Sequence, residues 1–251
     1  MNASGESQQP IRKLRGGIFD VDGVLVASPH EQAWREALAG FADPALFTTA
    51  FYQANVAGKP RLDGALAALQ QLGVADAASR FTDYATKKQA LIDRLIAEGS
   101  FKAFPDAVRL AAALKKMGFR LALASSSKNA EAMLRQLKIP GGRTLLSLFD
   151  ADLSGRTIPR GKPDPAIFLL SAEALGIPPE QCVVVEDAPA GIQAARAGGM
   201  AALGIARLHD ETLLRAAKAD LVVTSLDQLD LSTVAEGVLR ARPALEAAAN
   251  A

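Results

Sequence analysis

Apolar runs alternate with segments of helical periodicity along the second half of the chain. Runs of mostly apolar residues predict buried strands, which we place at 14–20, 119–124, 182–186, 200–205 and 221–223. Apolar residues at three- and four-residue spacing predict helices at 107–117, 130–137, 165–175, 191–197 and 211–217. Strands separated by helices in this way are typical of a parallel sheet that helices cover on both faces.

The segment from about residue 29 to 104 differs from the rest, because it carries only helical patterns and no strand signal. It follows the first predicted strand and ends at Pro105 and Asp106, which mark the start of a helix. The pattern therefore predicts an α/β fold class, in which an all-helical domain is inserted into the first crossover of a doubly wound parallel sheet. Ligands of such sheets bind at the carboxyl ends of the strands.

These elements divide the chain into a sheet domain, a helical domain and two terminal segments. The sheet domain takes residues 14–28 and 105–235, and the helical domain takes residues 29–104. Residues 1–13 are polar and rich in Ser and Gln, which predicts a disordered leader. The alanine-rich residues 236–251 are predicted to form a C-terminal tail.

The composition is that of an ordinary globular chain, with 49% hydrophobic and 22% charged residues. The 28 basic residues nearly balance the 27 acidic ones, which argues against a basic face for nucleic acid. No run approaches the ~18 apolar residues of a membrane span, and residues 1–13 lack a signal-peptide core. The single cysteine, Cys182, excludes a disulfide framework. We expect a cytoplasmic monomer or weak homodimer without nucleic-acid or membrane partners.

Polar side chains follow the first three predicted strands at the points where these strands end. Asp20 and Asp22 follow the first strand, and their spacing places both carboxylates on the same side of an extended chain. Two like charges this close require a metal, a proton or a basic side chain nearby. The stretch 125–129 follows the second strand, and Glu186 and Asp187 end the third. Parallel strands would bring these groups to one crevice.

Each of these motifs has an ordinary alternative when it is taken alone. The aspartates fit a hydrogen-bonded turn, the serines a helix cap, and Lys162 a solvated loop lysine. An EF-hand fits poorly, because Val24 stands where an oxygen ligand is needed, and a Walker loop fails because Pro163 follows the lysine. His30 and His209 stand apart from the motifs and are predicted to be surface or capping residues.

Taken together, the motifs resemble those of the haloacid dehalogenase superfamily over roughly residues 14–230. They occur in the order of that family: Asp20-x-Asp22, Ser125, Lys162 and Glu186-Asp187. The helical segment resembles a small C1-type cap, and the chain is most similar to the β-phosphoglucomutase-like subgroup. The resemblance implies a Rossmann-like core, Mg²⁺ as the cofactor and phosphoryl transfer as the reaction.

The same resemblance implies a role for each polar residue. Asp20 would be the nucleophile that forms an aspartyl-phosphate, and Asp22 would be the general acid and base. Mg²⁺ would bind the carboxylates of Asp20 and Asp187 and the main-chain carbonyl of Asp22, with Glu186 assisting directly or through water. The other implied site residues hold phosphate (Ser125, Ser126 and Lys162) or contact the rest of the substrate (Arg61, Lys88, Ser127, Lys128 and Asn129).

The resemblance leaves the reaction open between hydrolysis and isomerisation. Both use every residue of the core site, and they differ in whether water or a sugar hydroxyl attacks the aspartyl-phosphate. We expect a phosphatase acting on a small phosphorylated metabolite, a sugar phosphate. A β-phosphoglucomutase that interconverts β-glucose 1-phosphate and glucose 6-phosphate is the alternative. A non-catalytic binding module is a third hypothesis, against which the intact Asp20, Asp22, Lys162 and Asp187 speak.

Overall fold

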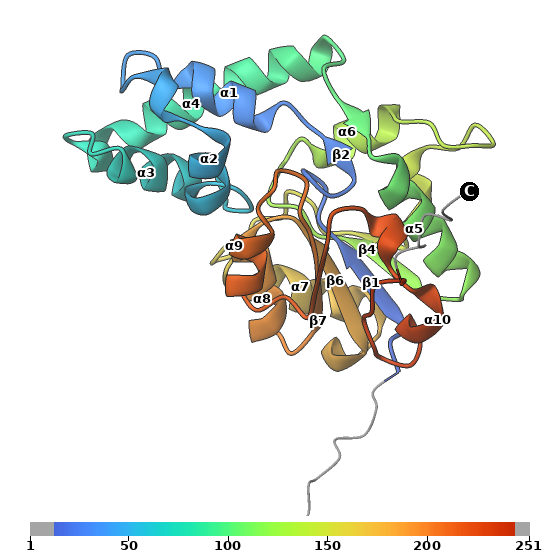
Figure 1. Ribbon diagram of the computed structural model, residues 1–251. Coiled ribbons are helices and arrows are strands. Elements are labelled where there is room, and N and C mark those ends of the chain that lie inside the picture. The colour runs from blue at the N-terminus through green and yellow to red at the C-terminus, as the bar shows by residue number, and fades with distance from the viewer. Residues whose placement is uncertain (1–12, 244–251) are drawn as a thin grey trace, which may run out of the picture.

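A six-stranded parallel sheet forms the centre of the computed structural model, which describes residues 13–243. The strand order is β5-β4-β1-β6-β7-β8, so the first strand lies between β4 and β6 (Figure 1). The strands are β1 (Gly16–Phe19), β4 (Arg120–Leu123), β5 (Ala151–Asp152), β6 (Cys182–Glu186), β7 (Ala201–Ile205) and β8 (Leu221–Val223). The predicted α/β fold class with a parallel sheet is confirmed.

Helices cover both faces of this sheet, because neighbouring residues of each strand point to opposite sides. Phe19 and Leu121 pack on the side of α5 (Pro105–Lys116), α6 (Ala130–Gln136) and α10 (Leu231–Val234). Ile18 and Val184 pack on the side of α7 (Ala166–Leu175), α8 (Pro189–Ala197) and α9 (Glu211–Ala216). Short 3₁₀ helices complete the connections: η1 (Pro44–Leu46), η2 (Leu145–Leu148), η3 (Pro179–Gln181) and η4 (Leu226–Gln228).

Four helices between residues 30 and 97, called the cap helices below, pack around an apolar core of their own. They are α1 (His30–Ala37), α2 (Thr49–Asn55), α3 (Arg61–Gln71) and α4 (Ala77–Ala97). Trp34, Leu69 and Tyr84 are buried among them, and the Tyr84 hydroxyl donates a hydrogen bond to the Trp34 carbonyl at 2.9 Å. The cap helices lie beyond the carboxyl ends of the central strands (Figure 1).

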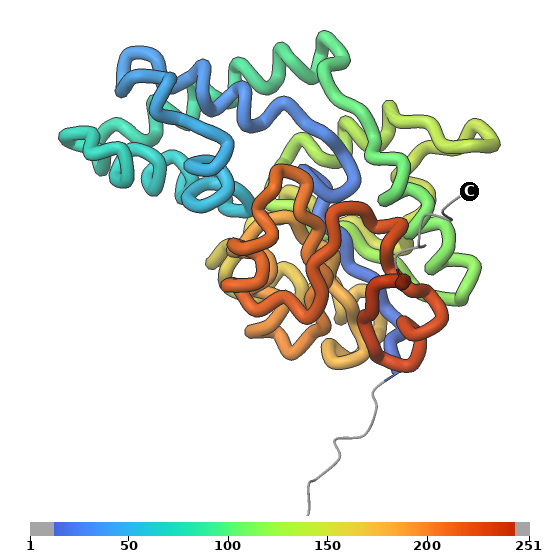
Figure 2. The backbone as a smooth tube through the Cα atoms, in the orientation of Figure 1, coloured from blue at the N-terminus to red at the C-terminus, as the bar shows by residue number. Residues whose placement is uncertain are grey.

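The chain passes between the sheet and the cap helices through two paired segments. β2 (Val26–Ala27) leads out and β3 (Lys102–Ala103) leads back, and the two form an antiparallel pair (Figure 2). The amide of Phe104 then donates to the carbonyl of Leu25 at 2.9 Å. The two connections are therefore held together where they meet the sheet.

The sequence-based prediction differs from the structure at its short strands. The segment 29–104 was expected to contain only helices, but it includes β3, and the edge strand β5 was not predicted. Both strands are two residues long, too short for alternating polarity to show. They form because a neighbouring strand supplies their hydrogen bonds.

The two terminal predictions fall mainly outside the described residues. The predicted leader 1–13 overlaps them only at Lys13, and residues 244–251 of the predicted tail are not described. Earlier in that tail, the amide of Arg242 donates to the Gln228 carbonyl at 2.7 Å, so this part is attached to the sheet domain. Within residues 13–243, no helix has the length and apolar character needed to cross a membrane.

Candidate active site

Three neighbouring strands, β4, β1 and β6, end side by side at one edge of the sheet. Their pairing continues past the last strand residues. The amide of Asp20 donates to the Val185 carbonyl at 3.1 Å, and the amide of Ala124 donates to the last carbonyl of β1 at 2.9 Å. Asp20 therefore lies between Ser125 and Glu186, and the strand-end motifs meet as the sequence predicted.

Lys162 joins all three of these strand ends. Its ammonium group donates to Asp20 Oδ1 at 2.7 Å, to Glu186 Oε1 at 2.6 Å and to the Ala124 carbonyl at 3.0 Å. The side chain has no solvent exposure and lies 4.9 Å from the centre of the Phe168 ring. A buried ammonium with three acceptors is well satisfied, and the two carboxylates raise the pKa of Lys162 despite its burial.

Asp20, Glu186 and Asp187 form a compact acidic cluster. Each offers one carboxylate oxygen, and these oxygens all lie within 4.8 Å of one another. Burial raises the pKa of Asp20 to about 7 although Lys162 opposes this, and burial also raises the pKa of Asp187 well above its usual value. A single lysine cannot neutralise three buried carboxylates, and oxygen ligands at this spacing suit a hard divalent cation such as Mg²⁺.

Two glycines allow the acidic cluster to pack this closely. Gly23 has a φ of +80°, and a Cβ atom there would lie 1.9 Å from Asp187 Oδ2. A Cβ atom on Gly191 would lie 2.0 Å from the carboxyl carbon of Glu186. The backbone of the turn after Asp22 and the first turn of α8 therefore touch the two carboxylates directly.

The carboxylate of Asp22 faces the cap helices. His30 Nε2 lies 3.3 Å from Asp22 Oδ1, and the Ser125 hydroxyl lies 3.5 Å from Asp22 Oδ2. Burial alone would raise the pKa of Asp22, but His30, a hydrogen bond from Ser28 and the charge of Lys88 hold it below its usual value. Asp20 and Asp22 thus have different surroundings: Asp20 contacts core groups, whereas Asp22 contacts groups of both the cap and the core.

His30 was predicted to be a surface or capping residue, and that prediction is wrong. Its side chain is buried, with Nδ1 2.8 Å from Lys88 Nζ and Nε2 3.2 Å from Ser127 Oγ. Lys88 is buried too, 4.9 Å from the Trp34 ring, and burial lowers its pKa to about 7. No local pattern marks His30, because Lys88 and Ser127, two of its three partners, come from distant parts of the chain.

The remaining site residues surround a cavity of about 390 Å³ between the sheet edge and the cap helices. Of the residues predicted to contact substrate, Arg61 is exposed and bonds to Gln89, whose amide also donates to Asn129 at 3.3 Å. The Ser126 hydroxyl donates to the Gly58 carbonyl at 3.1 Å and so links the core to the cap. The cavity is lined by every predicted substrate residue, Arg61, Lys88, Ser127, Lys128 and Asn129, and also by Trp34, Tyr52, Gln89 and Arg156.

Comparisons with known proteins agree with this geometry. Residues 15–199 match the model of a family described as haloacid dehalogenase-like hydrolases. The chain is 31% identical to hexitol phosphatase A of Escherichia coli over 229 residues, which cover 90% of this chain and 97% of that protein. The crystal structure of an archaeal β-phosphoglucomutase from Pyrococcus sp. strain ST 04 superposes with a TM-score of 0.67 and 32% identity, covering 87% of this chain and 96% of that one.

A third relative is much longer than this chain. The protein SUPPRESSOR OF QUENCHING 1, chloroplastic, of Arabidopsis thaliana is 28% identical over 230 residues. The match covers 90% of this chain, but the chain spans only 21% of the length of that protein.

Replacing Lys162 with Met should strongly destabilise the protein when no divalent metal is present. The change leaves Asp20 and Glu186 buried without their cation, so we expect the free energy of unfolding to fall by about 3–5 kcal/mol. Denaturant unfolding in a metal chelator measures the loss. A double variant with Glu186→Gln should recover part of it, because one of the uncompensated charges is then removed.

Lys115→Met is the matched control for this change. Lys115 pairs with Asp150 at 2.8 Å, but its side chain is 34% exposed, so the loss should stay below about 1 kcal/mol. Equal losses in the Lys162 and Lys115 variants would contradict a special role for the buried lysine.

Binding of Mg²⁺ should strengthen as the pH rises from about 6 to about 8. Protons compete with the metal for Asp20, whose pKa is raised to about 7, and for Asp187, whose pKa is raised further. Isothermal titration calorimetry in buffers of different ionisation enthalpy should therefore also detect proton release below pH ~7. Asp187→Asn should abolish the binding, and an affinity that does not change over this pH range would contradict the assignment.

Proposed function

The chain belongs to the haloacid dehalogenase-like hydrolase family, and we propose that it is a Mg²⁺-dependent phosphatase that hydrolyses a sugar phosphate through an aspartyl-phosphate on Asp20. The proposal rests above all on the buried cluster in which Lys162 contacts Asp20 while Glu186 and Asp187 leave negative charge for a cation. The names of two relatives, a hexitol phosphatase and a β-phosphoglucomutase, support phosphorylated sugars or sugar alcohols as the substrate class.

Phosphoryl transfer takes place in two steps at this site. In the first, a carboxylate oxygen of Asp20 attacks the phosphorus atom, the bond to the leaving oxygen breaks, and Asp22 gives that oxygen a proton. In the second, Asp22 takes a proton from water, whose oxygen attacks the phosphorus and releases inorganic phosphate and the free Asp20 carboxylate. The bound metal would neutralise charge on the phosphate oxygens.

The different surroundings of the two aspartates suit these two roles. Lys162 fixes Asp20 on the core side, so the nucleophile is held at the sheet edge. His30 holds the pKa of Asp22 below its usual value in the free enzyme, which suits a base. The negative charge of a bound phosphate monoester raises the pKa of a nearby carboxyl, which allows Asp22 to carry the proton that the first step needs.

The phosphate and the rest of the substrate would bind on opposite sides of the cavity. Ser125 and the amides that follow it would hold phosphate oxygens on the core side. Lys162 does not line the cavity and its three N–H groups are already bonded, so it would act on the phosphate through its charge and through Asp20. Arg61 and Lys88 on the cap side would contact the sugar portion, with Asn129.

A mutase is the second candidate, and the position of the cap supports it. The cavity lies between the sheet edge and the cap helices, so a bound sugar could exclude water from the aspartyl-phosphate. A sugar hydroxyl would then take the phosphoryl group in place of water. All residues of the first step would be the same.

A panel of sugar and sugar-alcohol phosphates assayed with Mg²⁺ tests the proposal. We expect release of inorganic phosphate from at least one member of the panel. Conversion of β-glucose 1-phosphate into glucose 6-phosphate, with a bisphosphate primer and without phosphate release, would select the mutase. Absence of any turnover by a folded protein that binds Mg²⁺ would contradict both activities and favour a binding module.

Two amide substitutions test the roles of the aspartates on the best substrate of that panel. Asp20→Asn should lose all turnover, because no nucleophile remains. Asp22→Asn should lower kcat by about 10² to 10⁴ while the protein still folds. Acid-quenched samples incubated with radiolabelled substrate should contain phosphoprotein for the wild type and none for Asp20→Asn. Labelled phosphoprotein in the Asp20 variant would overturn the assignment.

A further inference from the structure

The turn of residues 21–26, which contains the acid–base residue Asp22, is held by its own backbone hydrogen bonds, but two of its carbonyls accept none of them. The amides of Leu25 and Val26 donate to the Val21 carbonyl at 2.9 and 2.8 Å, and the amide of Gly23 donates to the Val26 carbonyl at 2.9 Å. The carbonyls of Gly23 and Val24 take no part in these bonds. These two carbonyls belong to the residues directly after Asp22.

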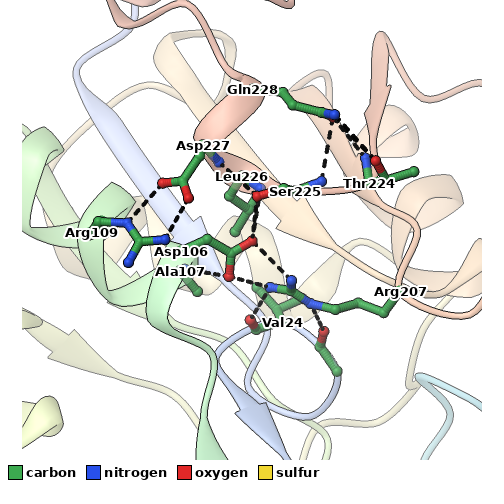
Figure 3. Close-up of polar contacts among 11 residues, drawn as sticks. Val24, Asp106, Ala107, Arg109, Arg207, Thr224, Ser225, Leu226, Asp227 and Gln228 are labelled. Carbon is green, nitrogen blue, oxygen red and sulfur yellow. Dashed lines mark hydrogen bonds and ion pairs between the residues drawn. The ribbon is translucent and has the colours of Figure 1, made fainter.

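Both carbonyls accept hydrogen bonds from Arg207, which lies just after β7. Its Nε donates to the Gly23 carbonyl and its Nη2 to the Val24 carbonyl, each at 3.2 Å (Figure 3). The other edge of the guanidinium makes two bonds to Asp106, of 2.9 and 3.0 Å. The Phe104 ring lies 3.8 Å from the guanidinium carbon, so the group is fixed on three sides.

Asp106 is itself held by groups from another part of the fold. Its carboxylate accepts bonds from the Ser225 hydroxyl at 3.1 Å and from the Leu226 amide at 2.9 Å, both in the connection after β8 (Figure 3). The side chains of Arg207 and Asp106 are only 14% and 9% exposed, so the pair is shielded from water. A bidentate Arg–carboxylate pair of this kind fixes the orientation of the guanidinium group as well as its distance from the carboxylate.

We propose that Arg207 is a positioning residue for Asp22, acting through the carbonyls of Gly23 and Val24, and that Asp106 orients its guanidinium. The inference rests on the proposed role of Asp22 in proton transfer. Gly23 also lies against the Asp187 carboxylate. A shift of this turn would therefore displace both Asp22 and the acidic cluster. None of the motifs in the sequence singles out Arg207 or Asp106.

Exchange of backbone amides tests the positioning without any need for activity. In Arg207→Gln, the amides of Gly23, Leu25 and Val26 should exchange at least about tenfold faster than in the wild type, because two charge-assisted bonds to the turn are lost. The amides of β6 should be unchanged. Wild-type exchange rates in the turn would overturn the inference, whatever the activity of the variant.

Arg109→Gln is the matched control. Arg109 lies on α5, the same helix as Asp106, and pairs with Asp227. Its side chain is 60% exposed, and none of its bonds reach the turn. We expect wild-type exchange in this variant. Arg207→Lys keeps the charge but not the planar fork, so it should show a smaller increase at the same amides, and it serves as the test if Arg207→Gln does not fold.

Kinetics with two phosphate esters separate positioning from general damage. A p-nitrophenyl ester needs little help from an acid, whereas an alkyl ester needs a proton on its leaving oxygen. In Arg207→Gln, kcat/KM for the alkyl ester should fall at least about tenfold more than for the p-nitrophenyl ester. Equal losses on both esters would overturn the inference. A wild type that hydrolyses neither ester would contradict the proposed function instead, and amide exchange would still decide whether Arg207 holds the turn.

Discussion

The ion pairs of Lys162 are the interaction on which the site depends. One fully buried ammonium group joins the ends of β1 and β6 through Asp20 and Glu186 and caps the end of β4 through a backbone carbonyl. It cannot balance the third carboxylate, Asp187, and the pKa of Asp20 stays near 7 despite the lysine. A structural ion pair would have no reason to bury this excess of negative charge. The cluster has the ligand atoms and the spacing of a group that could hold a metal ion.

The elements that carry this cluster are predictable from sequence because of how parallel sheets are built. Strands that helices cover on both faces consist almost wholly of apolar residues, and Cys182–Glu186 and Leu221–Val223 were predicted to the residue. Parallel strands end at one edge, so Asp20, Ser125 and Glu186 could be expected to meet before any coordinates were known. The contact of Lys162 with two carboxylates does not follow from this rule, because the lysine taken alone fits a solvated loop residue. Only the resemblance to a known family placed it in the site, and its bond to Glu186 was not predicted.

The cap side of the site was much less predictable, because its contacts join distant parts of the chain. His30 contacts Lys88 and Ser127, which are 58 and 97 residues away in the sequence. The periodicity of a single segment cannot predict contacts over such separations. β3 forms only because Val26 and Ala27 lie opposite it. Arg207 looks like any exposed loop arginine in the sequence, and its partner Asp106 looks like an ordinary residue of a first helical turn. Tertiary packing alone brings these groups together.

The division between the two sides has a chemical meaning. Asp20, the proposed nucleophile, and the acidic cluster are held by groups of the sheet domain. Asp22 lies on the turn that leads into β2 and the cap, and His30 at the start of α1 contacts it. Movement of the cap would therefore disturb Asp22, the proposed proton carrier, more directly than Asp20, the proposed nucleophile. Under the proposed mechanism, this arrangement links proton transfer by Asp22 to a substrate bound between cap and core, while Asp20 and the acidic cluster stay in place.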